Sequence, residues 1–184
     1  MSALEIKIAR KSYFHIGQDP LAALSDLRFK VDEGEFVSVV GPSGCGKTTL
    51  LNLIGGLDSD VDGSVLVNGV APEDGPVTGH MFQTPRLMPW LTVRDNISLV
   101  EKDSTTNGDR VDELLAEMGL ADFSDTYPAH LSGGMRRRLM VAKALVHSPP
   151  IVILDEPTAG VDVELRRQLW ELVTELNREG VVRW

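Results

Sequence analysis

The sequence is short of cysteine, of long apolar runs and of basic charge, and each shortage excludes a class of protein. Its single cysteine has no partner within the 184 residues, so no disulfide framework holds the chain together. No apolar run reaches the roughly 18 residues that cross a bilayer, and the first residues alternate charged and apolar side chains, unlike a signal peptide. Eighteen Lys and Arg residues against 27 Asp and Glu residues give a net charge of −9, which argues against a surface that binds nucleic acid over the whole molecule. We expect a soluble protein of a reducing compartment.

What the chain does contain is ordinary globular material, with 42% hydrophobic and 24% charged residues in a length suited to one domain. Short apolar or β-branched runs predict strands at 4–8, 36–40, 65–67 and 151–154, the second and the last of them buried. Apolar stripes at helical spacing predict helices that follow residues 49, 110, 132 and 162. Because strands and helices alternate, we predict an α/β fold with a parallel sheet.

A glycine-rich stretch lies between the predicted strand at 36–40 and the helix after it, and it fits the spacing G-x-x-x-x-G-K-[ST]. Glycines let successive backbone N–H groups turn toward one anion, while the helix start adds the positive end of its dipole. Lys47 brings a positive charge to the phosphates, and the Thr48 hydroxyl can ligate Mg²⁺. A chance glycine turn fits this context poorly. We therefore predict a nucleotide phosphate site made by Gly41, Ser43, Gly44, Cys45, Gly46, Lys47, Thr48 and Thr49.

Two adjacent acids, Asp155 and Glu156, follow the predicted strand at 151–154. Alternation along a strand would point them in different directions. We expect Asp155 to join the Mg²⁺ shell and Glu156 to polarise the water that attacks the γ-phosphate. Such a pair alone is often a solvated strand end, but together with the glycine loop it predicts a nucleotide hydrolase.

These motifs resemble the nucleotide-binding subunit of ATP-binding cassette (ABC) transporters. The most specific element is Leu131-Ser132-Gly133-Gly134, which is similar to the family's signature sequence, although a plain linker is the alternative. The resemblance implies a P-loop NTPase (RecA-like) parallel-sheet core with an N-terminal antiparallel β subdomain and an inserted α-helical subdomain, truncated at the C-terminus. It implies a single domain over 1–184, with the core at 1–83 and 148–184 and the helical subdomain at 84–147.

The resemblance also assigns roles to single residues. Ser132, Gly133 and Gly134 would contact the nucleotide held by a second copy, with Ser132 capping the helix that follows. Gln83 corresponds to a glutamine that reaches for the metal and the attacking water, which makes Gln83, Lys47 and Glu156 the implied catalytic residues; a surface glutamine is the alternative.

Tyr13 corresponds to an aromatic residue that stacks on adenine, with a half-buried strand tyrosine as the alternative. Asp162 matches a loop that contacts the opposite subunit, and a helix N-cap is the alternative or an additional role.

Three features depart from the family pattern. Met135 replaces the usual glutamine after the signature glycines, and a thioether cannot make an amide's hydrogen bonds. The segment 85–93 resembles importers of nitrate, sulfonate or taurine, whereas 135–177 resembles exporters of drugs or polysaccharides. The family's switch histidine is missing, because the four histidines, His15, His80, His130 and His147, all precede the acid pair.

The resemblance implies a subunit that binds and hydrolyses Mg²⁺·ATP as a homodimer or heterodimer and drives transport through a membrane permease. It would lie at the cytoplasmic face of the membrane, with residues 83–90 gripping a permease helix and no nucleic acid bound. The alternative is an ATP-binding or dimerisation module with little turnover, because the switch-histidine segment is missing. A cassette for DNA repair or translation would need coiled-coil or tandem-domain material. The basic run 136–138 is expected to be a solvent-facing part of a helix.

Overall fold

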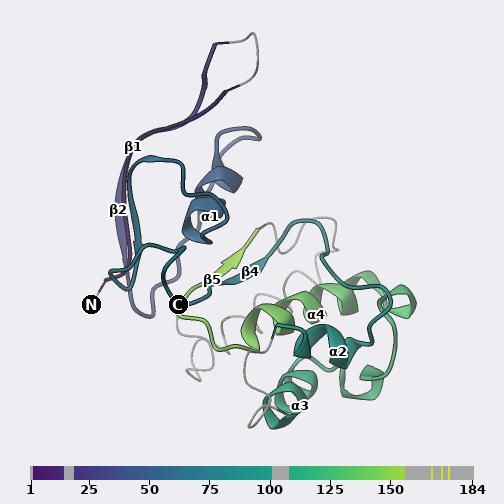
Figure 1. Ribbon diagram of the computed structural model, residues 1–184. Coiled ribbons are helices and arrows are strands. Elements are labelled where there is room, and N and C mark those ends of the chain that lie inside the picture. Colours follow the sequence, from purple (N-terminus) through teal and green to yellow (C-terminus); the bar gives the residue numbers. More distant parts are fainter. Residues whose placement is uncertain are drawn as a thin grey trace. The chain divides into compact units, whose positions relative to one another are not determined.

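The computed structural model describes residues 2–14, 19–100, 108–155, 167, 171 and 174 (Figure 1). They form two compact units that meet in sequence between Thr78 and Gly79. Each unit is treated by itself. Over the described part of the chain, no helix has the length and apolar character that a membrane span requires.

The first unit is built on an antiparallel sheet of three strands: β1 (Ser2–Tyr13), β2 (Leu21–Asp32) and β3 (Asp62–Val67). The strand order is β2-β1-β3, so β1 is central and pairs with both neighbours. The strand predicted at 4–8 is confirmed as part of β1, and its alternation buries Leu4, Ile6 and Ile8. The N-terminal antiparallel subdomain is thus present.

One helix and a tight turn complete the first unit. Helix α1 (Lys47–Ile54) follows the glycine loop as predicted and contacts β2 and β3, burying Leu50, Leu53 and Ile54. β3 ends at a turn in which Asn68 and Gly69 have φ angles of 51° and 81°. Two consecutive positive φ angles are typical of the tight turns that asparagine and glycine favour.

The buried strand predicted at 36–40 is wrong for this structure. The described chain has no strand between Asp32 and Lys47, and the side chains of Phe36, Val37, Val39 and Val40 are exposed. β-branched residues favour an extended, covered backbone, but a strand also needs a neighbour about 4.8 Å away to pair its N–H and C=O groups. Within this unit, β1 pairs with β2 and β3, and neither edge strand pairs with 36–40.

The second unit combines a short parallel sheet with helices. β4 (Gly79–Met81) and β5 (Val152–Leu154) pair in parallel, which confirms both the buried strand at 151–154 and the parallel pairing. Between Gly79 and Asp155 its described helices are α2 (Val93–Ser98), α3 (Gly108–Glu117) and α4 (Gly133–Leu145). Short 3₁₀ helices span Ala121–Phe123 and Pro128–His130.

Helix α4 is the centre of this unit, since it contacts both β4 and α2 (Figure 1). The predicted apolar stripe of α3 is confirmed: Val111, Leu114, Leu115 and Met118 are buried, and Gly119 ends the stripe at a φ of 61°. Of the helix predicted from residue 163, only Arg167, Glu171 and Thr174 are described, and all three are helical.

Candidate nucleotide-binding site

The glycine loop ends in a backbone conformation that only glycine adopts easily. Gly46 is the N-cap of α1 with a φ of 95°, and as a glycine it has no side chain that could accept a hydrogen bond from the first N–H groups of the helix. A Cβ on Gly46 would lie 2.5 Å from the carbonyl oxygen of Ala23, which leaves no room for a larger residue. The loop therefore brings the N-terminal N–H groups of α1 to a site where an anion can accept them.

Lys47 is folded back over this loop. Its Nζ donates hydrogen bonds of 2.8 Å to the carbonyl oxygens of Gly41 and Pro42 and lies 3.9 Å from Sγ of Cys45. Thr48 and Cys45 are exposed. The predicted phosphate ligands from Gly41 to Thr48 thus lie in the loop and the first residues of α1, with the Lys47 ammonium held over the loop carbonyls.

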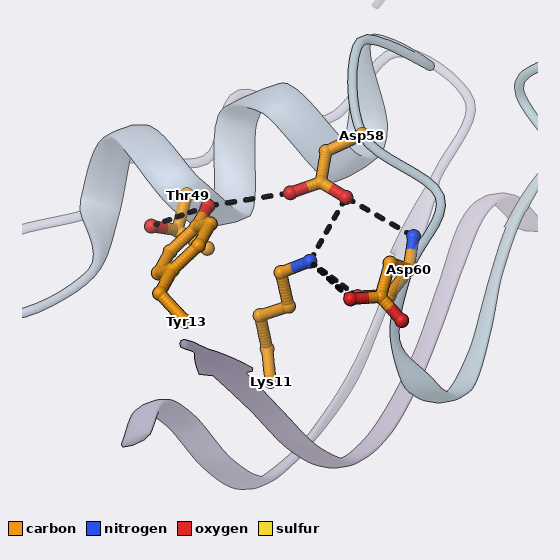
Figure 2. A network of polar contacts seen from close by, with 5 residues as sticks. All are labelled: Lys11, Tyr13, Thr49, Asp58 and Asp60. Atoms are coloured by element: carbon orange, nitrogen blue, oxygen red, sulfur yellow. Dashed lines mark hydrogen bonds and ion pairs between the residues drawn. The ribbon is translucent and has the colours of Figure 1, made fainter. Parts of the chain in front are cut away.

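Tyr13 is half-buried and belongs to a polar network (Figure 2). Its hydroxyl lies 3.3 Å from Oδ2 of Asp58 and 3.5 Å from Oγ1 of Thr49. Nζ of Lys11 donates to Oδ1 of Asp58 at 2.9 Å and also bonds the backbone oxygen of Asp60. The network links the end of β1 to the first turn of α1, and so places Tyr13 and Thr49, both predicted nucleotide contacts, in contact with each other.

The charges of the network support each other. Burial by itself would lower the pKa of the Lys11 ammonium, but the hydrogen bonds and charges of Asp58 and Asp60 outweigh it and raise that pKa. Burial would likewise raise the pKa of Asp58, yet the hydrogen bond from Lys11 and those from the Asp60 N–H and the Tyr13 hydroxyl lower it. Both groups are therefore ionised at neutral pH.

In the second unit, Asp155 lies at the carboxyl end of β5, as predicted. It is only 9% exposed, and its N–H donates to the carbonyl oxygen of Met81, which extends the parallel pairing by one residue. Carboxyl ends of parallel strands are where α/β proteins collect catalytic groups. The two remaining predicted residues of this region, Glu156 and Asp162, lie outside the described residues.

Gln83 follows β4 on an exposed segment that α4 holds through its backbone. Nη1 of Arg137 donates to the carbonyl oxygen of Gln83 at 3.4 Å, and Nζ of Lys143 donates to that of Arg86 at 3.1 Å. The helix that begins at the signature sequence therefore contacts the Gln83 segment at two points.

The signature residues open α4 as the sequence predicts. Oγ of Ser132 accepts a hydrogen bond of 3.2 Å from the N–H of Met135, so Ser132 is the N-cap of α4. A Cβ on Gly133 would meet no atom within 4 Å. The Ser132 cap is confirmed, while the contacts of Ser132, Gly133 and Gly134 with a nucleotide stay predictions.

The basic run after the signature is half-buried and is used inside the unit. Arg136 donates to the carbonyl oxygen of Leu131 at 2.7 Å and Arg138 to that of Met118 at 3.0 Å, while Arg137 reaches the Gln83 segment. The expectation that residues 136–138 simply face solvent is therefore corrected, because all three arginines bond backbone carbonyl groups. Consecutive arginines point to different sides of a helix, where each meets a different carbonyl group.

Sequence reasoning missed Asn96, which is completely buried in α2. Its Nδ2 lies within 3.1 Å of the carbonyl oxygens of Met88, Leu91 and Thr92, and its Oδ1 accepts from the N–H of Met88 at 2.8 Å. One amide thereby holds the irregular segment 88–92, which presents Trp90 with 70% of its surface exposed. No sequence signal marks Asn96, because its partners are backbone groups.

His80 of β4 was also missed as a structural residue. Its ring stacks on that of Phe82 with centroids 4.0 Å apart, and the Arg86 guanidinium lies 3.6 Å from the Phe82 centroid. Burial, with a smaller contribution from the Arg86 charge, lowers the pKa of His80 to about 4. His80 is therefore neutral at physiological pH.

Comparison with known proteins agrees with this geometry. Residues 24–159 match the ABC transporter family. The aliphatic sulfonates import ATP-binding protein SsuB 2 of Burkholderia cenocepacia (strain HI2424) is 42% identical over 175 residues, which cover 94% of this chain and 63% of that protein. SsuB of Bacillus subtilis (strain 168) is 40% identical over 182 residues, covering 96% and 70%. The chain thus spans just under two thirds of the length of the first of these relatives.

Solved structures point the same way. A dimeric post-hydrolysis state of the ATP-binding cassette MJ0796, bound to ADP and phosphate, superposes with a TM-score of 0.84 at 32% identity, covering 96% of this chain and 84% of that one. A second dimeric structure of the same cassette gives a TM-score of 0.82 at 31% identity over the same shares. With the glycine loop, the capped signature helix and the parallel pair that ends in Asp155, the chain belongs to the ABC transporter family and has the P-loop fold of its ATP-binding cassettes.

Proposed function

We propose that the chain binds Mg²⁺·ATP and hydrolyses it as the ATP-binding subunit of an importer of aliphatic sulfonates. The observation that carries this proposal is the glycine loop, where left-handed Gly46 opens α1 and Lys47 lies over the loop carbonyls. The sulfonate-importer names belong to relatives whose matched spans run over both halves of the chain, and they support import rather than export.

The residues present suit magnesium. The Thr48 hydroxyl, the Asp155 carboxylate and the Gln83 amide are hard oxygen donors, the type Mg²⁺ prefers. The described part of the chain holds no cluster of three or more His, Cys, Asp or Glu side chains suited to a metal, in keeping with an ion that takes most ligands from phosphate and water. When bound, the ion neutralises phosphate charge.

The other residues bind and orient the nucleotide. The loop N–H groups and Lys47 hold the phosphates, and the half-buried Tyr13 ring offers a surface for the base. Glu156 accepts a proton from the attacking water, which Gln83 orients.

A second copy of the chain, or a related subunit, completes the site. Ser132, Gly133 and Gly134 contact the nucleotide bound by the opposite subunit, and Asp162 contacts that subunit directly. The segment 88–92, held by Asn96 and presenting Trp90, contacts a cytoplasmic helix of the permease, so the subunit lies at the inner face of the membrane.

A paired titration tests the proposal: Mg²⁺·ATP binding and phosphate release are measured on the same sample. Lys47→Ala should weaken ATP binding by about 100-fold, because it removes the loop's only side-chain cation, whereas Lys30→Ala on exposed β2 is the matched control. Glu156→Gln should keep ATP affinity within about threefold and lose most phosphate release.

The outcomes separate the alternatives. Binding without phosphate release by the unmodified protein would favour a module without turnover. Unchanged release by Glu156→Gln would show that another group accepts the proton, and unchanged ATP affinity of Lys47→Ala would move the site elsewhere. Uptake of labelled alkanesulfonate by cells that hold the subunit with its permease tests the substrate class.

A further inference from the structure

The buried lysine of the first unit lies where its strand is irregular. Leu4, Ile6 and Ile8 of β1 face the core at every second position, but the next buried residue is Lys11, with 3% of its surface exposed. The register of β1 shifts between Ile8 and Arg10 against β3, and between Lys11 and Ser12 against β2. An irregularity of this kind turns a side chain to the other face of a sheet, so it places the Lys11 ammonium inside.

Asp58 uses both of its carboxylate oxygens. Oδ1 accepts from Nζ of Lys11 at 2.9 Å and from the N–H of Asp60 at 3.0 Å, whereas Oδ2 faces the Tyr13 hydroxyl at 3.3 Å (Figure 2). Buried ion pairs add little net stability because desolvation offsets their attraction, and their best-attested use is to specify geometry. The geometry specified here is that of Tyr13.

The tyrosine hydroxyl has one proton, and the charged carboxylate is the stronger acceptor. The Tyr13 proton therefore goes to Asp58, and the Thr49 hydroxyl lies 3.5 Å from the tyrosine oxygen, at the outer limit of a hydrogen bond. Nζ of Lys11 lies 4.9 Å from the centroid of the Tyr13 ring on one of its faces. A base that stacks on this ring must use the opposite face.

We propose that Asp58, held in place by Lys11, is a positioning residue for the nucleobase. Asp58 anchors the Tyr13 hydroxyl and so holds the ring at a set distance from Thr49 and the glycine loop, ready to stack on the base of a nucleotide whose phosphates the loop binds. This inference rests on the proposed ATP binding and assigns part of the base-dependent affinity to Asp58 and Lys11, which act through Tyr13 and do not touch the ligand themselves.

Two ligands separate base from phosphate: Mg²⁺·ATP and inorganic tripolyphosphate with Mg²⁺, each titrated into the full chain. Tyr13→Phe keeps the ring and the Lys11–Asp58 pair but removes the anchor, and it should weaken ATP binding by roughly fivefold while tripolyphosphate binding changes little. Tyr13→Ala should weaken ATP binding further, by roughly tenfold or more.

The double variant Lys11→Met/Asp58→Ala removes the anchor from the other side and should match Tyr13→Phe. Adding Tyr13→Phe to it should cause no further loss, because both changes break one interaction. The matched control is Lys30→Met/Glu5→Gln, which removes a more exposed ion pair of 3.2 Å in the same sheet and should leave both affinities unchanged. Urea unfolding of each variant reports on folding, and Tyr13→Phe remains informative if the double variant does not fold.

Equal losses for ATP and tripolyphosphate would overturn the inference, because the network would then act on the loop and not on the base. Full ATP affinity in Tyr13→Phe would overturn it as well, as would an unmodified protein that binds both ligands equally. If the unmodified protein binds neither ligand, the proposed function itself fails, which is a different result from a failure of the positioning role.

Discussion

Each unit has a helix with glycine at its start, but the first N–H groups of the two helices are treated in opposite ways. In the first unit, α1 starts from Gly46 in a left-handed conformation, and this N-cap glycine has no side chain to cap the helix. In the second, α4 starts from Ser132 in an extended conformation, and its hydroxyl accepts from the Met135 N–H.

The difference concerns where the helix finds its hydrogen-bond acceptors. A helix whose first N–H groups lack a side-chain acceptor is stabilised when an anion binds to them. A helix with its own N-cap has its first turn ordered before any ligand binds. The glycine loop is therefore the part of the molecule that phosphate should order, and the signature helix is a preformed surface.

The largest expected effect tests the loop backbone. Gly46→Ala forces a side chain into a φ of 95° and places its Cβ 2.5 Å from the Ala23 carbonyl oxygen. We expect ATP affinity to fall by about 100-fold, with a loss of about 1–3 kcal/mol in the free energy of unfolding. Calorimetric titration and urea unfolding measure the two quantities.

Gly133→Ala is the matched change in the other helix start, where a Cβ meets nothing within 4 Å. The free energy of unfolding should stay the same or rise by up to about 1 kcal/mol, since alanine favours helix. If Gly46→Ala and Gly133→Ala lowered the free energy of unfolding equally, the contrast between the two helix starts would be contradicted.

A second prediction concerns the thiol in the loop. Cys45 is exposed, and its Sγ lies so close to Gly41 that a Cβ there would be 2.6 Å from it. Alkylation adds bulk where phosphate should bind and is expected to weaken ATP binding by about 30-fold. The Cys45→Ser variant should resist the reagent, and unaltered affinity after complete labelling of Cys45 would count against the placement of the site.

The stabilities of the two units should also respond differently to a fall in pH. His80 has a pKa of about 4 when folded and an ordinary value of 6.5, so the unfolded chain takes up the proton first as the pH falls. The resulting stability is present above about pH 6.5 and is lost toward pH 4, amounting to about 1–2 kcal/mol between about pH 7 and about pH 5. Urea unfolding across this range should show the slope, and His80→Phe should remove it while His130→Gln at an exposed site keeps it.

The ion pair of the first unit should instead contribute a stability that does not depend on pH near neutrality. Because the pKa of Asp58 is lowered, its contribution to the free energy of unfolding is fully present at pH values above its ordinary pKa of 3.8. Because the pKa of Lys11 is raised, its contribution is fully present at pH values below 10.5. The difference between the unmodified protein and Lys11→Met/Asp58→Ala should therefore be constant between about pH 5 and about pH 9. A slope near neutral pH would refute the ionised pair.

The smallest effect tests the cap. Ser132→Ala removes the acceptor for the Met135 N–H and should lower the free energy of unfolding by about 1 kcal/mol, while Ser132→Asp should restore it. ATP affinity of the isolated subunit should not change, because in the proposal Ser132 serves the opposite subunit. A loss of affinity in the monomer would place Ser132 in its own site.

Much of the local structure could be predicted. The spacing of Gly41 to Thr48 predicts a phosphate loop before a helix, and Ser132 predicts a cap. The helix after the loop and the cap are present because they depend on residues within a few positions, while phosphate binding stays a prediction. The strand predicted at 36–40 was wrong because a run of apolar residues indicates only that the segment favours burial. The sequence does not show which strand would pair with it.

By itself, the sequence determined where the helices after the glycine loop and after Ser132 begin and the family to which the chain belongs, since these follow from residue types and short spacings. Only the tertiary structure decided that Lys11 faces the core and binds Asp58, that Asn96 holds a segment eight residues away, and that three consecutive arginines bond three separate carbonyl groups. A register shift and a backbone carbonyl leave no mark on side-chain periodicity, so these contacts exist only once the chain has folded.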